Sequence, residues 1–210
     1  FPLTKIIQAR HPQVKRAVRR FLMSQMQLLK MALDPRDIVY TPDWVACDMV
    51  SFFKPSGIIL EPCAGDGVFL KYLPSAQWCE IEKGVDFFAW QKPVNWLFGN
   101  PPYNNLKEWF THSFSIAENI VYLLPVTKIF NSYYQMMDVY QYGGISHIRV
   151  YGAGSKLGWQ MGFAIGAIHL QKNYTGSIEV SFYQHAPNTA CSGLAPAGAS
   201  DGQISSGASR

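Results

Sequence analysis

The chain has 210 residues, of which 48% are hydrophobic and 15% are charged, which is enough for one α/β domain with an apolar core. No run approaches the ~18 uncharged apolar residues of a membrane span, and the N-terminus lacks a signal-peptide hydrophobic region, so we expect a cytoplasmic protein with no membrane partner. The four cysteines and five histidines are scattered and include no CxxC pair, so their spacing gives no support for a metal site.

The net charge of +4 is concentrated near the N-terminus. Residues 1–37 carry eight basic and two acidic groups, a net +6, which leaves −2 for the rest of the chain. Apolar residues recur at helical spacing over residues 12–33, with basic residues between them. We expect residues 1–37 to form a basic amphipathic helical arm that suits a polyanionic partner, although a solvated helix face explains the charge equally well.

Strands and helices then alternate along the chain. Thr41 and Pro42 predict the N-cap and first position of a helix that runs through Val50. Beyond it, apolar runs predict strands over residues 57–62, 77–82, 95–100 and 120–125, and helical spacing predicts helices over residues 68–73, 107–117 and 129–140. This order indicates a mostly parallel sheet with right-handed crossovers.

The last part of the chain predicts further strands and a tail. Residues 145–151 read as a strand, followed by a glycine-rich connection over residues 152–162. The strand candidates 163–171 and 177–183, joined by KNYTG, predict an antiparallel hairpin that closes the sheet. Residues 186–210 are rich in Gly, Ala and Ser, so we expect a disordered tail.

Ligands of parallel sheets bind at the carboxyl ends of strands, so these ends are where we look for chemistry. In LEPCAGDG (60–67), Glu61 ends the first strand, and Gly65 and Gly67 open a turn toward the expected helix. Glycines allow close backbone approach to a ligand, and a carboxylate there suits a cationic group such as an amine or a sulfonium. A tight turn without a ligand remains an alternative.

The next strand end carries Glu80, which can accept hydrogen bonds from both hydroxyls of a ribose. Asp86 and Phe87 follow and can take an exocyclic amine and one face of an adenine, although Phe87 also reads as a core aromatic beside a solvated acid. Together, the three segments describe a pocket for an adenosine with an amino-acid-like tail, which is the shape of S-adenosylmethionine.

The stretch LFGNPPYNN (97–105) ends a buried strand with two prolines, which cannot donate to a sheet ladder. The side-chain oxygen of Asn100 and the carbonyl of Pro101 can both accept from one amine, and Pro102 helps to fix their direction. Tyr103 can stack on a flat ring that bears the amine. Two preset acceptors would free the lone pair of the amine for attack on a methyl sulfonium.

These motifs resemble those of a known family. GNPPYNN (99–105), LEPCAGDG (60–67) and YTPDWVACDMVSFF (40–53) are similar to motifs IV, I and X of the gamma-type N6-adenine DNA methyltransferases of restriction-modification systems and phages. CEIE and VDFFAW resemble the second and third motifs, IVYLLPVTKIF the sixth, and residues 162–183 the closing strands. The resemblance implies a Rossmann-like class I methyltransferase domain over residues 38–185, an α/β fold with a mostly parallel seven-stranded sheet and a C-terminal antiparallel hairpin.

The resemblance also implies a role for each candidate residue, with S-adenosylmethionine as the cofactor. Phe130 is a further candidate for packing on the base, although a core position fits it better. A target adenine in duplex DNA would have to be flipped out of the stack. The resemblance assigns the methionine moiety to Thr41, Glu61, Pro62, Ala64, Gly65 and Gly67, the ribose to Glu80, the cofactor adenine to Asp86 and Phe87, and the target amine to Asn100, Pro101, Pro102 and Tyr103, with Asn100 also near the cofactor.

One departure concerns target recognition. Gamma-type enzymes usually carry a recognition region after the catalytic domain, and residues 186–210 do not resemble one. Phosphate contacts from the basic arm would position DNA without specifying a sequence. Specificity for a DNA sequence could then come from a separate recognition partner. The Asn-Pro-Pro-Tyr turn also occurs in RNA methyltransferases and in protein glutamine methyltransferases, and a non-catalytic nucleic-acid-binding subunit is a further alternative.

Overall fold

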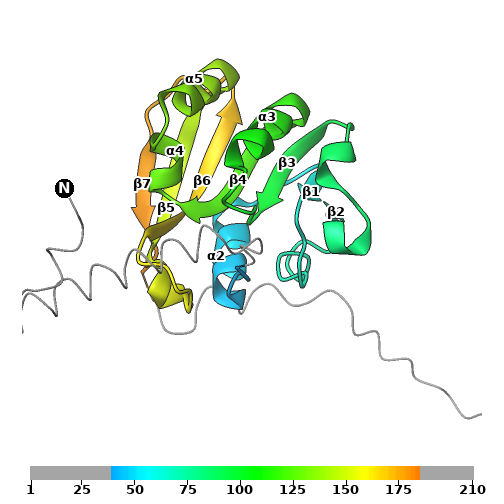
Figure 1. The fold of residues 1–210 in the computed structure, drawn as a ribbon, viewed down its shortest axis with the longest axis horizontal. Coiled ribbons are helices and arrows are strands. Elements are labelled where there is room, and N and C mark those ends of the chain that lie inside the picture. Colours follow the sequence, from blue (N-terminus) through cyan, green and yellow to red (C-terminus); the bar gives the residue numbers. More distant parts are fainter. Residues whose placement is uncertain (1–38, 185–210) are drawn as a thin grey trace, which may run out of the picture. The chain divides into compact units, whose positions relative to one another are not determined.

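The computed structural model describes residues 39–184, which form a seven-stranded sheet with helices on both of its faces (Figure 1). The predicted arm of residues 1–37 and the tail of residues 186–210 lie outside the described residues. In chain order the elements are α2 (Asp43–Phe53), β1 (Ile59–Glu61), β2 (Gln77–Trp78), 3-10 helices Ile81–Lys83 and Phe87–Ala89, β3 (Val94–Gly99), α3 (Leu106–Ile116), β4 (Ala117–Pro125), α4 (Thr127–Phe130), α5 (Tyr133–Tyr142), β5 (Gly143–Ala153), a 3-10 helix Gly154–Leu157, β6 (Ala164–Lys172) and β7 (Glu179–Phe182).

The strands lie in the order β2-β1-β3-β4-β6-β5-β7. β6 is antiparallel to both of its neighbours, β4 and β5, and every other neighbouring pair is parallel. The mostly parallel sheet with an antiparallel pair near its C-terminal end is therefore confirmed. The chain moves outward from β1 to β2 and then returns to the other side of β1 with β3, so the carboxyl ends of β1 and β3 flank the point where strand order reverses.

The predicted hairpin between the last two strands is wrong. β6 pairs with β4 on one edge and with β5 on the other, which leaves no free edge for β7. β7 instead runs parallel to β5, with His147 opposite Glu179 and Val150 opposite Phe182. The reason is burial: most of β6 is buried, whereas β7 has no buried residue and fits the border of the sheet.

Three helix predictions also differ from the structure. Residues 68–73 form turns rather than a helix, because the segment is too short to repay helix nucleation and Pro74 follows it. The helix expected over residues 129–140 is divided into α4 and α5, since the Ser132 hydroxyl accepts from the Gln135 N–H and caps a new helix. The N-cap of α2 is Pro42, not Thr41. Within residues 39–184, no helix is both long enough and apolar enough to cross a membrane.

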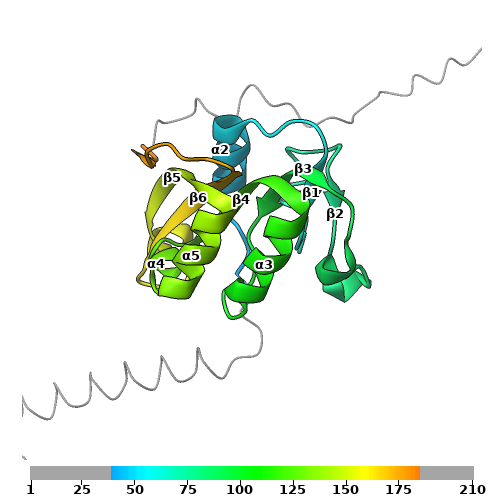
Figure 2. The same cartoon turned by 90° about the horizontal axis from the view of Figure 1, so that it is seen from above.

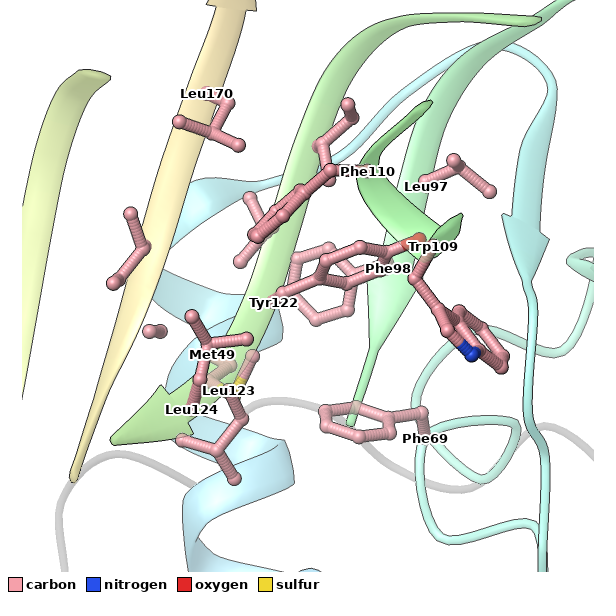
Figure 3. Packing of buried hydrophobic residues seen from close by; sticks show 14 of the residues in the cluster. Met49, Phe69, Leu97, Phe98, Trp109, Phe110, Tyr122, Leu123, Leu124 and Leu170 are labelled. Carbon is pink, nitrogen blue, oxygen red and sulfur yellow. The ribbon is translucent and has the colours of Figure 1, made fainter. Parts of the chain in front are cut away.

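Helices cover both faces of the sheet, with α2 on one side and α3, α4 and α5 on the other (Figure 2). The buried residues of α3 recur at helical spacing, which gives the helix one apolar face; they are Leu106, Trp109, Phe110, Ser113 and Ile116. Phe110 meets the ring of Tyr122 on β4 with centroids 6.0 Å apart (Figure 3), and the Tyr122 hydroxyl pairs with Ser113 at 2.8 Å. These contacts hold α3 against β4, which is the neighbour of β3 in the sheet.

A partly buried ion pair fastens α2 to the sheet. Arg149 of β5 donates to both carboxylate oxygens of Asp48 over 2.5 and 2.8 Å, and the Tyr151 hydroxyl also donates to Asp48 at 2.8 Å. Two-point pairing of a guanidinium with a carboxylate fixes geometry as well as charge. Only Pro42 separates residues 39–41 from α2, so the ion pair that holds α2 also anchors one side of the candidate site.

Candidate functional site

The ends of β1 and β3 lie in close contact at the point where strand order reverses. A Cβ added to Gly99, the last residue of β3, would come within 3.2 Å of the Pro62 side chain just after β1. The Cys63 thiol donates to the backbone oxygen of Asn100 at 3.1 Å, and burial raises the pKa of this thiol well above its ordinary value. The two predicted motifs therefore form one continuous region.

Glu61 is the most unusual polar residue of this region. It ends β1, its side chain is 1% exposed, and its Oε2 atom has no hydrogen-bond partner among the described residues. Burial, reinforced by the negative charges of Asp66 and Glu80, raises the pKa of Glu61 to about 8. A buried carboxylate without a partner is costly, and a cationic ligand would remove that cost.

The loop after Glu61 has the backbone that its glycines predict. Gly65 and Gly67 have φ values of +53° and +85°, which other residues rarely adopt. The Ala64 N–H donates to the Cys79 oxygen at 2.9 Å, and the Gly67 N–H donates to the Ala64 oxygen at 2.7 Å. The loop is thus a folded turn held against the end of β2, but no regular helix follows to add a helix N-terminus to the site.

Glu80 lies just beyond β2 and is tied to the glycine loop. Its carboxylate accepts from the Gly65 N–H at 2.5 Å and from the Glu82 N–H at 3.3 Å. The Lys83 ammonium donates to the Gly65 oxygen at 3.1 Å, so this turn and the loop hold each other. Ile81, next in the chain, is 68% exposed, an apolar side chain beside the predicted ribose acceptor that our sequence reasoning missed.

The structure separates the roles predicted for Asp86 and Phe87. Asp86 follows Val85, which is bridged to Glu80, and its carboxylate accepts from the Phe88 N–H at 2.9 Å. The Phe87 ring is 3% exposed and stacks on Trp109 with centroids 4.7 Å apart. This ring packs in the core rather than offering an open face to an adenine, as the alternative interpretation of the sequence stated.

Asn100 is held through both ends of its side-chain amide. Its Nδ2 donates to the Val39 oxygen at 2.8 Å, and its Oδ1 accepts from the Tyr103 hydroxyl at 2.8 Å. The Tyr103 side chain is only 5% exposed, and Pro101 is also buried. The expected aromatic platform therefore lies folded inward in this structure, with its hydroxyl on the acceptor that we predicted for an amine.

Residues 39–41, which we call the strap, connect the two motifs to a third segment. The strap has no regular secondary structure and leads into α2, and Thr41 within it is buried. The Tyr40 ring is 56% exposed, and it would lie 3.6 Å from a Cβ added at Gly65. The Trp159 indole N–H donates to the Tyr40 oxygen at 2.9 Å. Nothing in the sequence pattern indicated Trp159, because a buried tryptophan in a glycine-rich connection has no distinguishing spacing.

Two further points concern the predicted residue types. Phe130, at the end of α4, is exposed rather than part of the core. Over residues 39–184, no three His, Cys, Asp or Glu side chains are grouped so that they could hold a metal ion. The chemistry available at this site consists of carboxylates, an amide, backbone groups and aromatic rings.

Solved structures share this fold. A Listeria monocytogenes protein assigned to the class I S-adenosylmethionine-dependent methyltransferases superposes with a TM-score of 0.53 and 14% identity, over 75% of this chain and 70% of that one. A Vibrio vulnificus protein assigned as a modification subunit of a type I restriction enzyme superposes with a TM-score of 0.53 and 10% identity, over 86% of this chain and 54% of that one. The chain thus spans about half the length of the Vibrio protein. No protein-family model and no curated protein matches the sequence. The likeness shows the Rossmann-like fold of class I methyltransferases.

Proposed function

We propose that this chain transfers the methyl group of S-adenosylmethionine to the N6 amine of adenine in DNA. The observation that carries the proposal is a pair of side chains at neighbouring strand ends. Glu61 is a buried carboxylate whose Oε2 has no hydrogen-bond partner among the described residues, and Asn100 is an amide held in one orientation. The first suits a cationic tail, and the second suits an amine that donates hydrogen bonds.

The residues of the site fit the proposed cofactor. The orphaned Oε2 of Glu61 is a ready acceptor for the amino group of a methionine tail. Gly65 and Gly67 have left-handed backbone and carry no side chain of their own, which leaves room for a ligand to approach the loop backbone. In the proposal, Thr41, Pro62 and Ala64 line the methionine end of the cofactor. The Glu80 carboxylate gives up its hydrogen bond from the Gly65 N–H and accepts from the ribose hydroxyls instead. Asp86 and the backbone of Phe87 contact the adenine.

The cofactor would supply a methyl group on a positively charged sulfur. Asn100 Oδ1 and the Pro101 carbonyl would accept the two hydrogens of the target amine and draw its nitrogen toward a tetrahedral geometry, which frees the lone pair for in-line attack. The prolines at 101 and 102 limit backbone freedom, so little ordering is required on binding. The Tyr103 side chain would leave Asn100 and stack on the ring that carries the amine.

DNA is proposed as the target on three grounds. The motif order resembles that of the gamma-type adenine enzymes, residues 1–37 carry a net charge of +6, and one structural neighbour is assigned as a restriction-enzyme modification subunit. Phosphate contacts made by basic residues would position DNA without reading its sequence. We therefore propose that a separate recognition partner supplies site selection.

The decisive experiment identifies the methylated product. Purified full-length chain is incubated with S-adenosylmethionine labelled in its methyl group and, in separate reactions, with adenine-containing DNA, RNA and a glutamine-containing protein, and each product is digested and analysed by mass spectrometry. The proposal expects N6-methyladenine from DNA. Label in RNA or in a glutamine amide would replace the proposed target, and calorimetry that detects no cofactor binding would favour a non-catalytic subunit.

A further inference from the structure

Two hydrogen bonds link the connection between β5 and β6 to the amide of Asn100 through the strap, and a third joins that amide to Tyr103. The Trp159 indole N–H donates to the Tyr40 oxygen at 2.9 Å. The neighbouring carbonyl of the strap, that of Val39, accepts from Asn100 Nδ2 at 2.8 Å. Asn100 Oδ1 then accepts from the Tyr103 hydroxyl at 2.8 Å. Trp159 and Asn100 are far apart in the sequence and are joined through two consecutive residues of the strap.

The strap carbonyl selects the orientation of the Asn100 amide. A carbonyl oxygen only accepts hydrogen bonds, so the NH₂ end of the amide must face Val39 and the oxygen must face the other way. Rotating the amide by half a turn would bring its oxygen against the Val39 oxygen and lose the bond to Val39. The direction of the proposed catalytic acceptor therefore depends on where the strap holds the Val39 carbonyl.

Trp159 is well placed to hold the strap. Trp159 is 9% exposed, and its backbone N–H donates to the Gly154 oxygen at 3.0 Å. The Gly154 N–H in turn donates to the Phe163 oxygen at 2.9 Å, which closes the connection between β5 and β6. The indole is therefore supported by a hydrogen-bonded turn. The side chain of Tyr40, whose backbone oxygen accepts from the indole, is more than half exposed.

We propose that Trp159 is a positioning residue for Asn100 that acts through the strap. This inference rests on the proposed function, because it assigns Trp159 a part in orienting the acceptor of the target amine. The indole N–H fixes the Tyr40 carbonyl, the adjacent Val39 carbonyl is fixed with it, and the amide of Asn100 is thereby kept with its oxygen toward the substrate. Trp159 itself contacts no reacting atom.

The test removes one N–H and leaves the ring shape unchanged. Trp159 is replaced in the full-length chain by benzothienylalanine, an isostere of tryptophan whose sulfur cannot donate. The matched control is the same replacement at Trp90, whose indole N–H also donates to a backbone oxygen, that of Lys92, at 2.9 Å. Trp159→Phe is made in parallel as a second variant that keeps an aromatic ring, and thermal unfolding verifies that each variant is folded.

Two measurements read the result. The first is the side-chain amide resonance of Asn100 in asparagine-labelled protein, assigned by its loss in Asn100→Asp. The second is steady-state methyl transfer. We expect the Trp159 variants to shift the Asn100 amide resonance and to lower kcat about two- to tenfold with a smaller change in the KM for cofactor, which is the effect of one lost hydrogen bond. The Trp90 control should change neither quantity.

The outcomes separate this inference from the proposed function. An Asn100 resonance that stays in place in the folded Trp159 variants would overturn the positioning role, whatever the activity. If the unmodified chain transfers no methyl group, the proposed function fails, and the resonance still decides whether Trp159 orients Asn100. If neither Trp159 variant folds, hydrogen exchange in the unmodified protein decides: the positioning role requires the Trp159 indole and the Asn100 amide to be protected together, and independent exchange would overturn it.

Discussion

The Tyr103 hydroxyl donates a hydrogen bond to Asn100 Oδ1 across 2.8 Å, while its ring is almost completely buried. The acceptor that the proposed reaction requires is thus occupied by the chain itself. A target amine would compete with this hydroxyl for Asn100 Oδ1. The ring proposed to stack on the base and the hydroxyl that blocks the acceptor belong to one side chain, so a single rotation of Tyr103 would both open the acceptor and present the ring.

Substitutions of Tyr103 test this double role. Tyr103→Phe removes the competing hydroxyl and keeps the ring, so we expect methyl transfer at or above the rate of the unmodified chain. Tyr103→Ala removes the ring, and loss of stacking on one base, worth ~1–3 kcal/mol, should lower kcat/KM about five- to 150-fold. Both are measured by label transfer, with circular dichroism to confirm folding. A Tyr103→Phe variant as impaired as Tyr103→Ala would show that the hydroxyl takes part in the reaction.

Asn100→Ala tests the proposed acceptor directly. We expect methyl transfer to fall by about 10²-fold or more, because a preorganised hydrogen-bond acceptor at the reacting group is lost. Cofactor affinity measured by calorimetry should change only a few-fold, since Glu61 and the glycine loop are untouched. Asn104→Ala, an exposed asparagine of the same turn, is the control and should keep its activity. Undiminished turnover in Asn100→Ala would remove Asn100 from the mechanism.

Cofactor binding should release a proton from Glu61. Its pKa of about 8 keeps this carboxyl mostly protonated at pH 7, and a bound ammonium group would lower that pKa. Affinity for S-adenosylmethionine should therefore rise with pH between 6 and 8. Calorimetry at pH 7 in buffers of different ionisation enthalpy counts the protons released. Glu61→Gln should bind more weakly and release about one proton fewer. Equal proton release by both proteins would place the ligand's cation elsewhere.

The same carboxyl should make stability depend on pH. Folding raises the pKa of Glu61 from 4.5 to about 8, so between these values the folded state binds more protons than the unfolded state, and the free energy of unfolding falls as pH rises. One such group contributes a slope of about 1.4 kcal/mol per pH unit. Urea unfolding at pH 5, 6.5 and 8 should show a shallower decline for Glu61→Gln. The exposed Glu82→Gln serves as the control, with an unchanged slope.

The partly buried ion pair between Asp48 and Arg149 predicts a large loss of stability on removal of one partner. Arg149→Met leaves the carboxylate of Asp48, which is 5% exposed, without its partner, and we expect a loss of about 3–5 kcal/mol in the free energy of unfolding. Lys71→Met breaks the exposed pair with Asp43 and should leave stability nearly unchanged. Urea unfolding of both variants makes the comparison. Equal effects would mean that burial does not distinguish the two pairs.

Sequence reasoning located the strands that carry the site. β1, β3 and β4 are largely buried apolar runs, and the places where these runs stop located Glu61, which ends β1, and Asn100, which follows β3. Local patterns did not predict features that depend on tertiary contacts. The burial of Phe87 depends on Trp109 of α3 lying against it. The inward fold of Tyr103 depends on the orientation of Asn100.

The C-terminal strands show the same limit at the level of the sheet. The turn before β7 fitted a hairpin with β6, and nothing in either strand's own pattern indicated that β6 would be inserted between β4 and β5. The role of Trp159 depends on a hydrogen bond to Tyr40, which lies far away in the sequence. The strand order depends on competition among strand edges, and the Trp159 hydrogen bond depends on a long-range contact. The alternation of apolar and polar residues within one strand encodes neither.

The place of β6 in the sheet has a consequence for the growing chain. β4 is a nine-residue, largely buried apolar strand, and the edge that it presents to β6 stays open until residues 164–172 have left the ribosome. Throughout the synthesis of α4, α5, β5 and the connection that holds Trp159, a nascent chain carries an unpaired hydrophobic edge, the kind of surface that chaperones bind and on which aggregation starts. Closure of the β4 edge during biosynthesis therefore waits for the late segment that forms β6.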